Sequence, residues 1–228
     1  MVLMTDSRFR SEQGILTLKL PLREVWRNYV PPEVTFKGTV IDIESDEQSF
    51  INSLRGAQRY RDFNAICCGF LDSNFMEIIG RTDTKSDKFF KEAVASRLDA
   101  TIEPYYAFNA GFDMAVLSRL LGRNINFHGE LQPAPKWKKE YYRQDIGVPS
   151  FDDPFHGEGR LASAEWTSYL KNCNVDSVKR IMVHNAACVC IEYSMLTRKG
   201  YRMIQQFSCQ EFYEGKSELA YDNRMSSC

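Results

Sequence analysis

The chain has 228 residues, of which 43% are hydrophobic and 26% are charged, and its formal net charge is −1. This composition is typical of a globular protein and excludes collagen, coiled coils, intrinsic disorder and bundles of membrane helices. Because the net charge is close to zero, a nucleic-acid site would need a local basic patch or an acidic centre that recruits metal ions.

The sequence predicts a cytoplasmic protein with no membrane contact. No stretch of about eighteen apolar residues occurs, and Asp6 and Arg8 interrupt the start of the chain, where a signal peptide needs an apolar run. The seven cysteines are odd in number and include no CxxC pair. We therefore expect reduced thiols and no zinc.

We expect one folded domain over residues 34–200, an irregular lead-in over 1–33, and a C-terminal extension over 201–228 that packs on or trails from the domain. Apolar runs of β-branched residues predict strands, and apolar stripes of helical period predict helices. The predicted strands are 34–44, 64–71, 74–80 and 105–108, with a further candidate at 203–207. The predicted helices are 87–98, about 112 to 122, 162–170 and 175–196. The first three strands should be antiparallel neighbours in a mixed sheet flanked by helices, an α/β fold.

Two carboxylates close the first of these strands, in the run Asp42-Ile43-Glu44. Side chains alternate along a strand, so Asp42 and Glu44 share a face, and their α-carbons lie about 6.6–7 Å apart. Both carboxylates can then reach one cation, which would relieve their mutual repulsion. The alternative is a strand that emerges into solvent.

A second polar group lies where a strand should lead into a helix, in Asn109-Ala-Gly-Phe112-Asp113. Ligands collect at such sheet edges. Phe112 can insert into the core and hold Asp113 outwards. The alternative is that Asn109 or Asp113 only caps the helix.

The third group lies on the last long helix, where His184 and Cys188 share a face and Glu192 follows one turn later. The surrounding residues are apolar, so the helix is buried and the histidine needs a partner. The alternative is a hydrogen-bonded core histidine beside small packing cysteines.

Taken in order, these three groups resemble the motifs of the DnaQ-like (DEDD) 3′–5′ exonuclease superfamily, which has a ribonuclease H-like fold. VIDIES resembles the first motif, YAFNAGFDMAVLSRLL the second and HNAACVCIEYSML the third, over about Val34 to Leu196. The resemblance implies that Asp42, Glu44 and Asp113 bind Mg²⁺ or Mn²⁺. It also implies that His184 orients or deprotonates the attacking water.

The third motif is degenerate, because the family's last acid falls at Cys188. A thiol is a soft substitute for the oxygen ligands that magnesium prefers. Three outcomes follow. Glu192 supplies the missing carboxylate, one metal site survives on Asp42 and Asp113, or the site is inactive and only the fold remains.

The segment 136–143, KWKKEYYR, joins basic and aromatic residues. Lys138 can neutralise a phosphate, and Trp137 and Tyr141 can stack on unpaired bases. The alternative is an amphipathic surface helix.

We therefore predict a metal-dependent 3′–5′ exonuclease acting on single-stranded DNA or RNA, with Asn109, Phe112 and Cys188 lining the substrate site. The alternative is a catalytically impaired ribonuclease H-like module that binds nucleic acid or a protein partner.

Overall fold

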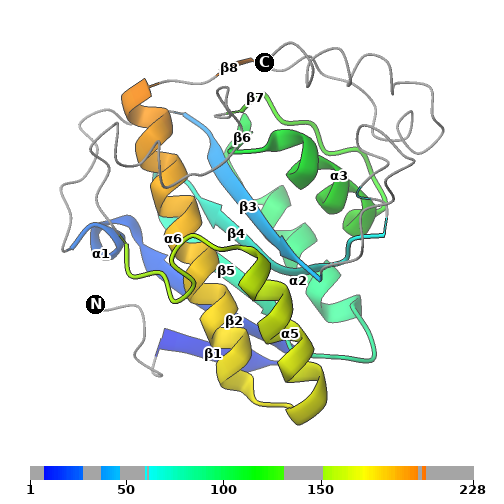
Figure 1. Cartoon of the computed structure of the whole chain (residues 1–228). Helices are drawn as coiled ribbons and strands as arrows, with labels where there is room; N and C mark the ends of the chain where they lie inside the picture. Colours follow the sequence, from blue (N-terminus) through cyan, green and yellow to red (C-terminus); the bar gives the residue numbers. More distant parts are fainter. Residues whose placement is uncertain are drawn as a thin grey trace.

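The computed structural model describes residues 8–27, 37–46, 60, 62–130, 151–199 and 202–203. These residues form a mixed α/β structure around an eight-stranded sheet of order β1-β2-β5-β4-β3-β6-β7-β8 (Figure 1). The strands are β1 (Phe9–Glu12), β2 (Ile15–Pro21), β3 (Thr39–Ser45), β4 (Ala65–Leu71), β5 (Phe75–Arg81), β6 (Tyr105–Ala107), β7 (Gly129–Glu130) and β8 (Arg202–Met203). The helices are α1 (Leu22–Val25), α2 (Lys88–Asp99), α3 (Ala110–Leu121), α5 (Arg160–Asn172) and α6 (Val175–Lys199).

The predicted antiparallel trio is confirmed, because β4 pairs antiparallel with both β3 and β5. On its other edge β3 pairs in parallel with β6, and β6 pairs in parallel with β7. After β3 the chain forms β4 and β5 on one side of β3, and it later returns to form β6 on the other side. Such a reversal of direction opens a crevice at the carboxyl ends of the parallel strands.

The prediction of an irregular lead-in is wrong for residues 9–21, which form the hairpin β1–β2 on the edge of the sheet. The turn lies at Gln13 and Gly14, both with positive φ, and β2 pairs along its length with β5. Leu16, Leu18 and Leu20 are buried at alternate positions of β2. This period of two is the ordinary pattern of a strand with one buried face.

Helices cover both faces of the sheet (Figure 1). Helices α5 and α6 share a core cluster with Val40 of β3, whereas α2 and α3 share the opposite cluster with Ile41 and Ile43. Side chains alternate along a strand. Asp42 and Glu44 therefore lie on the α6 face of β3.

The helix ends follow local rules. Gly122 ends α3 with φ of 66°, a conformation that favours glycine, as the sequence predicted. Asn174 begins α6 by accepting a hydrogen bond from the backbone N–H of Asp176 at 3.0 Å. No helix among the described residues has both the length and the apolar character of a membrane span.

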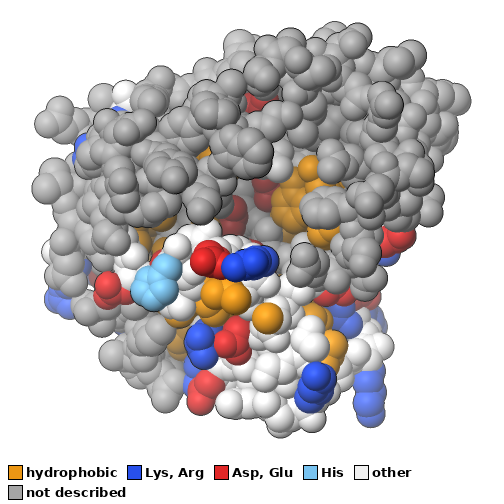
Figure 2. All heavy atoms as spheres, in the orientation of Figure 1, with side chains coloured by type: hydrophobic (Ala, Val, Ile, Leu, Met, Phe, Trp, Pro, Cys, Tyr) orange, Lys and Arg blue, Asp and Glu red, His pale blue; other side chains and the backbone are white. Residues whose placement is uncertain are grey.

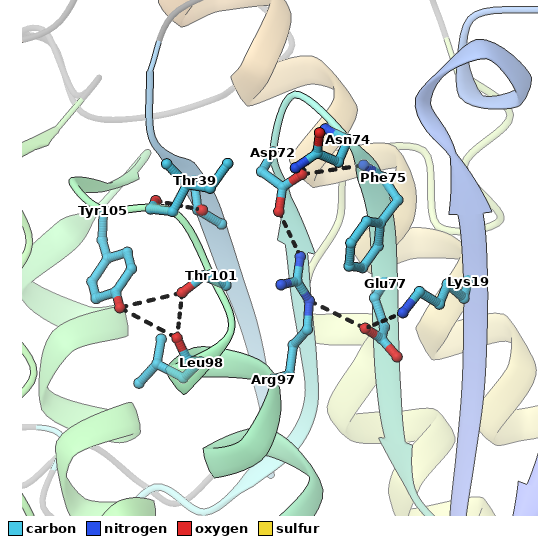
Figure 3. Close-up of polar contacts among 11 residues, drawn as sticks. Lys19, Thr39, Asp72, Asn74, Phe75, Glu77, Arg97, Leu98, Thr101 and Tyr105 are labelled. Carbon is cyan, nitrogen blue, oxygen red and sulfur yellow. Dashed lines mark hydrogen bonds and ion pairs between the residues drawn. The ribbon is translucent and has the colours of Figure 1, made fainter.

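A buried ion-pair network joins α2 to the turn between β4 and β5 (Figure 3). The guanidinium of Arg97 lies 2.9 Å from Asp72 Oδ2 and 3.1 Å from Glu77 Oε2. Its carbon also lies 4.2 Å from the ring centre of Phe75. Elsewhere, charges of both signs are interspersed on the described part of the face seen in Figure 2.

Candidate functional site

The two strand acids lie inside the protein and not in solvent. Asp42 is 7% exposed and Glu44 is 8% exposed, so the alternative of a strand emerging into solvent is wrong. The pairing of β3 with β4 shifts register between Glu44 and Ser45. Irregularities of this kind are common beside active sites, where they redirect a side chain.

Asn185 of α6 holds the carboxylate of Asp42. Its Nδ2 donates to Asp42 Oδ2 at 2.7 Å and to the backbone oxygen of Asp42 at 3.0 Å. Gly69 is the cross-strand neighbour of Asp42, and a Cβ at Gly69 would collide with Asn185 Oδ1. The missing side chain on β4 therefore makes room for the amide that orients the acid.

Asp113 reaches β3 from the first turn of α3. Its Oδ1 accepts a hydrogen bond from the backbone N–H of Ile43 at 3.1 Å, between the two strand acids. Strand β6 pairs with β3 only at Thr39 and Val40. Beyond Val40 the same edge of β3 is not paired with β6, and there it faces the start of α3. The strand N–H thus fixes the carboxylate.

The alternative that Asn109 or Asp113 serves only as a helix cap is wrong. Asn109 is the N-cap residue of α3 but makes no capping hydrogen bond through its side chain. Its Oδ1 is buried and has no hydrogen-bond partner among the described residues. Phe112 is half-buried, with its ring centre 5.1 Å from that of Tyr60. Asp113 is the more buried of the two, so the expectation that Phe112 would hold Asp113 outwards is wrong.

His184 is a buried histidine with several partners. Its Nδ1 lies 2.7 Å from Asp153 Oδ1, and its Nε2 lies 3.5 Å from Glu44 Oε1 and 3.7 Å from Cys188 Sγ. Burial works to lower the pKa of His184, but Cys188, Glu44 and the hydrogen bond with Asp153 raise this pKa to about 12. The imidazole is therefore positively charged at neutral pH in the metal-free protein.

Asp153 is the anionic partner of this imidazolium. Burial opposes the charge of Asp153, but His184 and the backbone N–H groups of Phe155 and Gly157 lower its pKa. The ring of Phe155 lies 5.0 Å from the imidazole, centre to centre. The segment before α5 therefore fixes the orientation of the histidine.

The two residues named for the missing acid have different surroundings. Cys188 is buried beside His184, as the helical spacing predicted. Glu192 is fully buried, and its Oε2 accepts a hydrogen bond from the backbone N–H of Phe108, at 3.1 Å. This carboxylate therefore braces the chain at the end of β6.

The three acids converge on one part of the sheet. Burial is the main cause of the raised pKa of the Cys68 thiol, and Asp113, Asp42 and Glu44 raise that pKa further. The geometric link between the acids is the hydrogen bond from the backbone N–H of Ile43 to Asp113, which places Asp113 beside the segment of β3 that carries Asp42 and Glu44. Three carboxylates at one end of a strand offer the oxygen ligands that Mg²⁺ and Mn²⁺ prefer, although their oxygens do not form a set within 4.8 Å of one another.

The described residues contain one compact set of possible metal ligands, and it differs from the set that the sequence predicted. One ligand atom each from Glu44, His184 and Cys188 lies within 4.8 Å of the other two. The predicted ligands Asp42, Asp113 and Glu192 lie outside this tighter set. The sequence argument against zinc rested on the absence of cysteine pairs close together in the chain. It did not consider a set of ligands that come from two separate elements, as this one does from β3 and α6.

Sequence reasoning missed Asp153 and Asn185. Asn185 adjoins His184, and its place in the motif was the available signal. Asp153 follows a segment with no periodic pattern, so nothing in the sequence tied it to α6. Three predicted substrate residues, Trp137, Lys138 and Tyr141, lie outside the described residues.

Comparisons of this chain with protein-family models, with curated proteins and with solved structures give no match. The functional argument therefore depends on the geometry of the site.

Proposed function

We propose that the chain is a divalent-metal-dependent phosphodiesterase that removes nucleotides from the 3′ end of single-stranded DNA or RNA. One observation carries the proposal. Asp113, some seventy residues away in sequence, docks on the backbone of Ile43 between Asp42 and Glu44. Three acids that are remote along the chain are thereby gathered at the end of one strand.

We infer a ribonuclease H-like scaffold of the DnaQ-like type, to which β1 and β2 are added at the β5 edge and β8 beyond β7. Antiparallel β3, β4 and β5 lie on one side, and β6 and β7 continue the sheet in parallel on the other. The acids lie where β3 ends and where β6 leads into α3. This is the part of an open α/β sheet at which ligands bind.

Asp42, Glu44 and Asp113 would hold Mg²⁺ or Mn²⁺. The ions would activate water and stabilise the leaving oxygen of the phosphodiester. Asn185 fixes the orientation of Asp42. His184, held by Asp153 with its Nε2 towards Glu44, would orient the attacking water.

Asn109 and Phe112 would contact the substrate at the start of α3. The Oδ1 of Asn109 is buried and accepts no hydrogen bond from the described residues, so a nucleotide donor brought to this position would satisfy it. The ring of Phe112 is half-buried against the core cluster of Ile41 and Ile43, and its exposed part would be the surface that meets a substrate. The neighbouring rings of Tyr60 and Phe63 support it.

Cys188 favours a second candidate, a ribonuclease H-like module that binds nucleic acid or a protein without cleaving it. Its sulfur stands 3.7 Å from His184 Nε2, where the family pattern has an acid. Cys188→Asp discriminates the two. An increase in cleavage would show an intact site limited by the thiol, whereas Mn²⁺ binding without cleavage in either protein would favour the module.

The direct test is incubation of single strands labelled at the 5′ end with Mn²⁺. We expect stepwise shortening that a blocked 3′ end prevents and that Asp42→Asn abolishes. Asp176→Asn is the matched control, because Asp176 is exposed on α6. Absence of shortening, or shortening unchanged by Asp42→Asn, would contradict the nuclease proposal.

A further inference from the structure

Glu44, His184 and Cys188 form a compact and chemically mixed cluster at the contact between β3 and α6. The three residues are buried, and the cluster combines one carboxylate, one imidazole and one thiol. Cys188 and His184 are one turn apart on α6, and Glu44 approaches from the facing strand. Each of the three side chains therefore projects from a helix or a strand and not from a loop.

The spacing of the ligand atoms matches a tetrahedral ion. Zinc bonds of about 2.0–2.1 Å to nitrogen, 2.0–2.2 Å to oxygen and 2.3 Å to sulfur give tetrahedral edges of about 3.4 Å for nitrogen–oxygen and about 3.6 Å for nitrogen–sulfur. The observed separations are 3.5 Å from His184 Nε2 to Glu44 Oε1 and 3.7 Å from Nε2 to Cys188 Sγ. The ligand atoms of Glu44 and Cys188 lie within 4.8 Å of each other, so the third edge shortens when the ion draws the two side chains together.

Asp153 supplies the outer-shell partner that metal-binding histidines use. Its Oδ1 lies 2.7 Å from His184 Nδ1 and selects the tautomer in which Nδ1 carries the proton. When an ion displaces the proton on Nε2, the lone pair of that nitrogen faces Glu44 and Cys188. A carboxylate in this position fixes the ring and increases its basicity as a ligand.

Gly159 borders the cluster on its exposed side. A Cβ at Gly159 would lie 3.7 Å from His184 Nε2 and 4.0 Å from Glu44 Oε2. The glycine itself is exposed, so water can approach the cluster from this side. Three protein ligands and an open fourth position are the arrangement of a zinc site that binds water or substrate.

We propose that Glu44, His184 and Cys188 bind one borderline-soft divalent ion of the zinc class, with Asp153 as outer-shell partner and water as the fourth ligand. The carboxylate and the thiolate balance the two charges of the ion, and the proton between Nε2 and Sγ passes to the buffer. Thiolate and imidazole select zinc-class ions over magnesium. The site shares Glu44 and His184 with the proposed nuclease, but binding is measured without nucleic acid, so failure of this inference is distinguishable from failure of the nuclease proposal.

Cobalt(II) is the probe, because its bond to a thiolate gives a charge-transfer band in the near ultraviolet. We expect the full-length chain, kept reduced with a phosphine, to develop this band up to one equivalent and to lose it when Zn²⁺ is added. Cys188→Ser should abolish the band. Cys190→Ser is the matched control, since that buried thiol contacts Met76, and it should leave the band unchanged.

Asp153→Asn should weaken Zn²⁺ binding by about 10–100-fold in a calorimetric titration, the usual effect of removing an outer-shell partner. Cys188→Asp keeps a ligand at this position and should bind Co²⁺ without the charge-transfer band, which covers the case that Cys188→Ser fails to fold. A wild-type chain without the band, or a band that persists in Cys188→Asp, would overturn the inference. Either result leaves Mn²⁺-dependent cleavage to be judged by its own assay.

Discussion

Buried carboxylates occur in two regions of this protein, and their partners differ. In the Arg97 network (Asp72, Glu77 and Arg97), a permanently charged guanidinium lies between two acids (Figure 3). At the end of β3, the Asp42 carboxylate contacts the neutral amide of Asn185, and Glu44 faces the titratable imidazole of His184.

The difference shows how a buried charge can serve either the fold or a ligand. The Arg97 side chain is 4% exposed and that of Asp72 is 2% exposed, so each charge is neutralised inside the protein. The contacts of Asp42 and Asp113 include neutral N–H donors, which orient a carboxylate without neutralising its charge. Oriented acids of this kind attract a cation from solution.

The largest expected effect is on stability, in the Arg97 network. Arg97→Met should lower the free energy of unfolding by about 3–5 kcal/mol, because it leaves the buried Asp72 without its partner. Urea denaturation measures the change. Arg123→Met is the control, since its pair with Asp99 is exposed and should contribute less than about 1 kcal/mol. Equal losses in the two variants would show that Arg97 has no special role.

The next effect should appear in activity and not in stability. Asp113→Asn keeps an oxygen that accepts from Ile43 N–H but removes the charge, so the urea midpoint should stay close to that of the wild type. The Mn²⁺-dependent cleavage rate should fall by about 10²-fold or more, since a metal contributes several kcal/mol to the transition state. A large loss of stability with normal cleavage would show that Asp113 serves the fold, as Asp72 and Glu77 do.

A smaller effect should follow when the space for Asn185 is filled. Gly69→Ala sets a methyl group against Asn185 Oδ1 and close to Ile78 and Val189. We expect a loss of about 1–3 kcal/mol in stability, as for other overpacked cores, together with weaker Mn²⁺ binding. Gly159→Ala meets its neighbours at ordinary contact distances and should leave urea stability unchanged. A fully stable Gly69→Ala protein would contradict this account of Asp42.

The smallest effect concerns the thiols. Burial, with the nearby acids, raises the pKa values of Cys67 and Cys68, so these thiols should stay protonated and unreactive in the folded protein. Cys173 is exposed and should react with iodoacetamide. Peptide mass spectrometry after brief labelling separates the sites. Labelling of Cys67 at the rate of Cys173 would show that the β4 core opens readily.

The regular elements with strong patterns could be predicted from the sequence. The strands β3, β4 and β5 are short apolar runs, and α3 ends at Gly122 as expected. The hairpin β1–β2 was missed although Leu16, Leu18 and Leu20 alternate along β2. The Gln13-Gly14 turn lacks the Asn-Gly or Asp-Gly signal of a tight hairpin.

The acids of the site were predictable because their motifs lie at the ends of predicted elements. The environment of His184 could not be predicted, because its partner Asp153 comes from a segment without a periodic pattern. The pairing of His184 with Cys188 follows from their spacing on one helix and was predicted. The approach of Glu44 depends on the packing of α6 across β3, which residue spacing does not record and which only the family resemblance implied.

The most direct test of the account is a crystal soaked in MnCl₂ and measured at the manganese absorption edge. The account predicts an anomalous peak bound by carboxylate oxygens of Asp42, Glu44 and Asp113. A peak confined to His184 and Cys188, or no peak within bonding distance of Asp42, would contradict it.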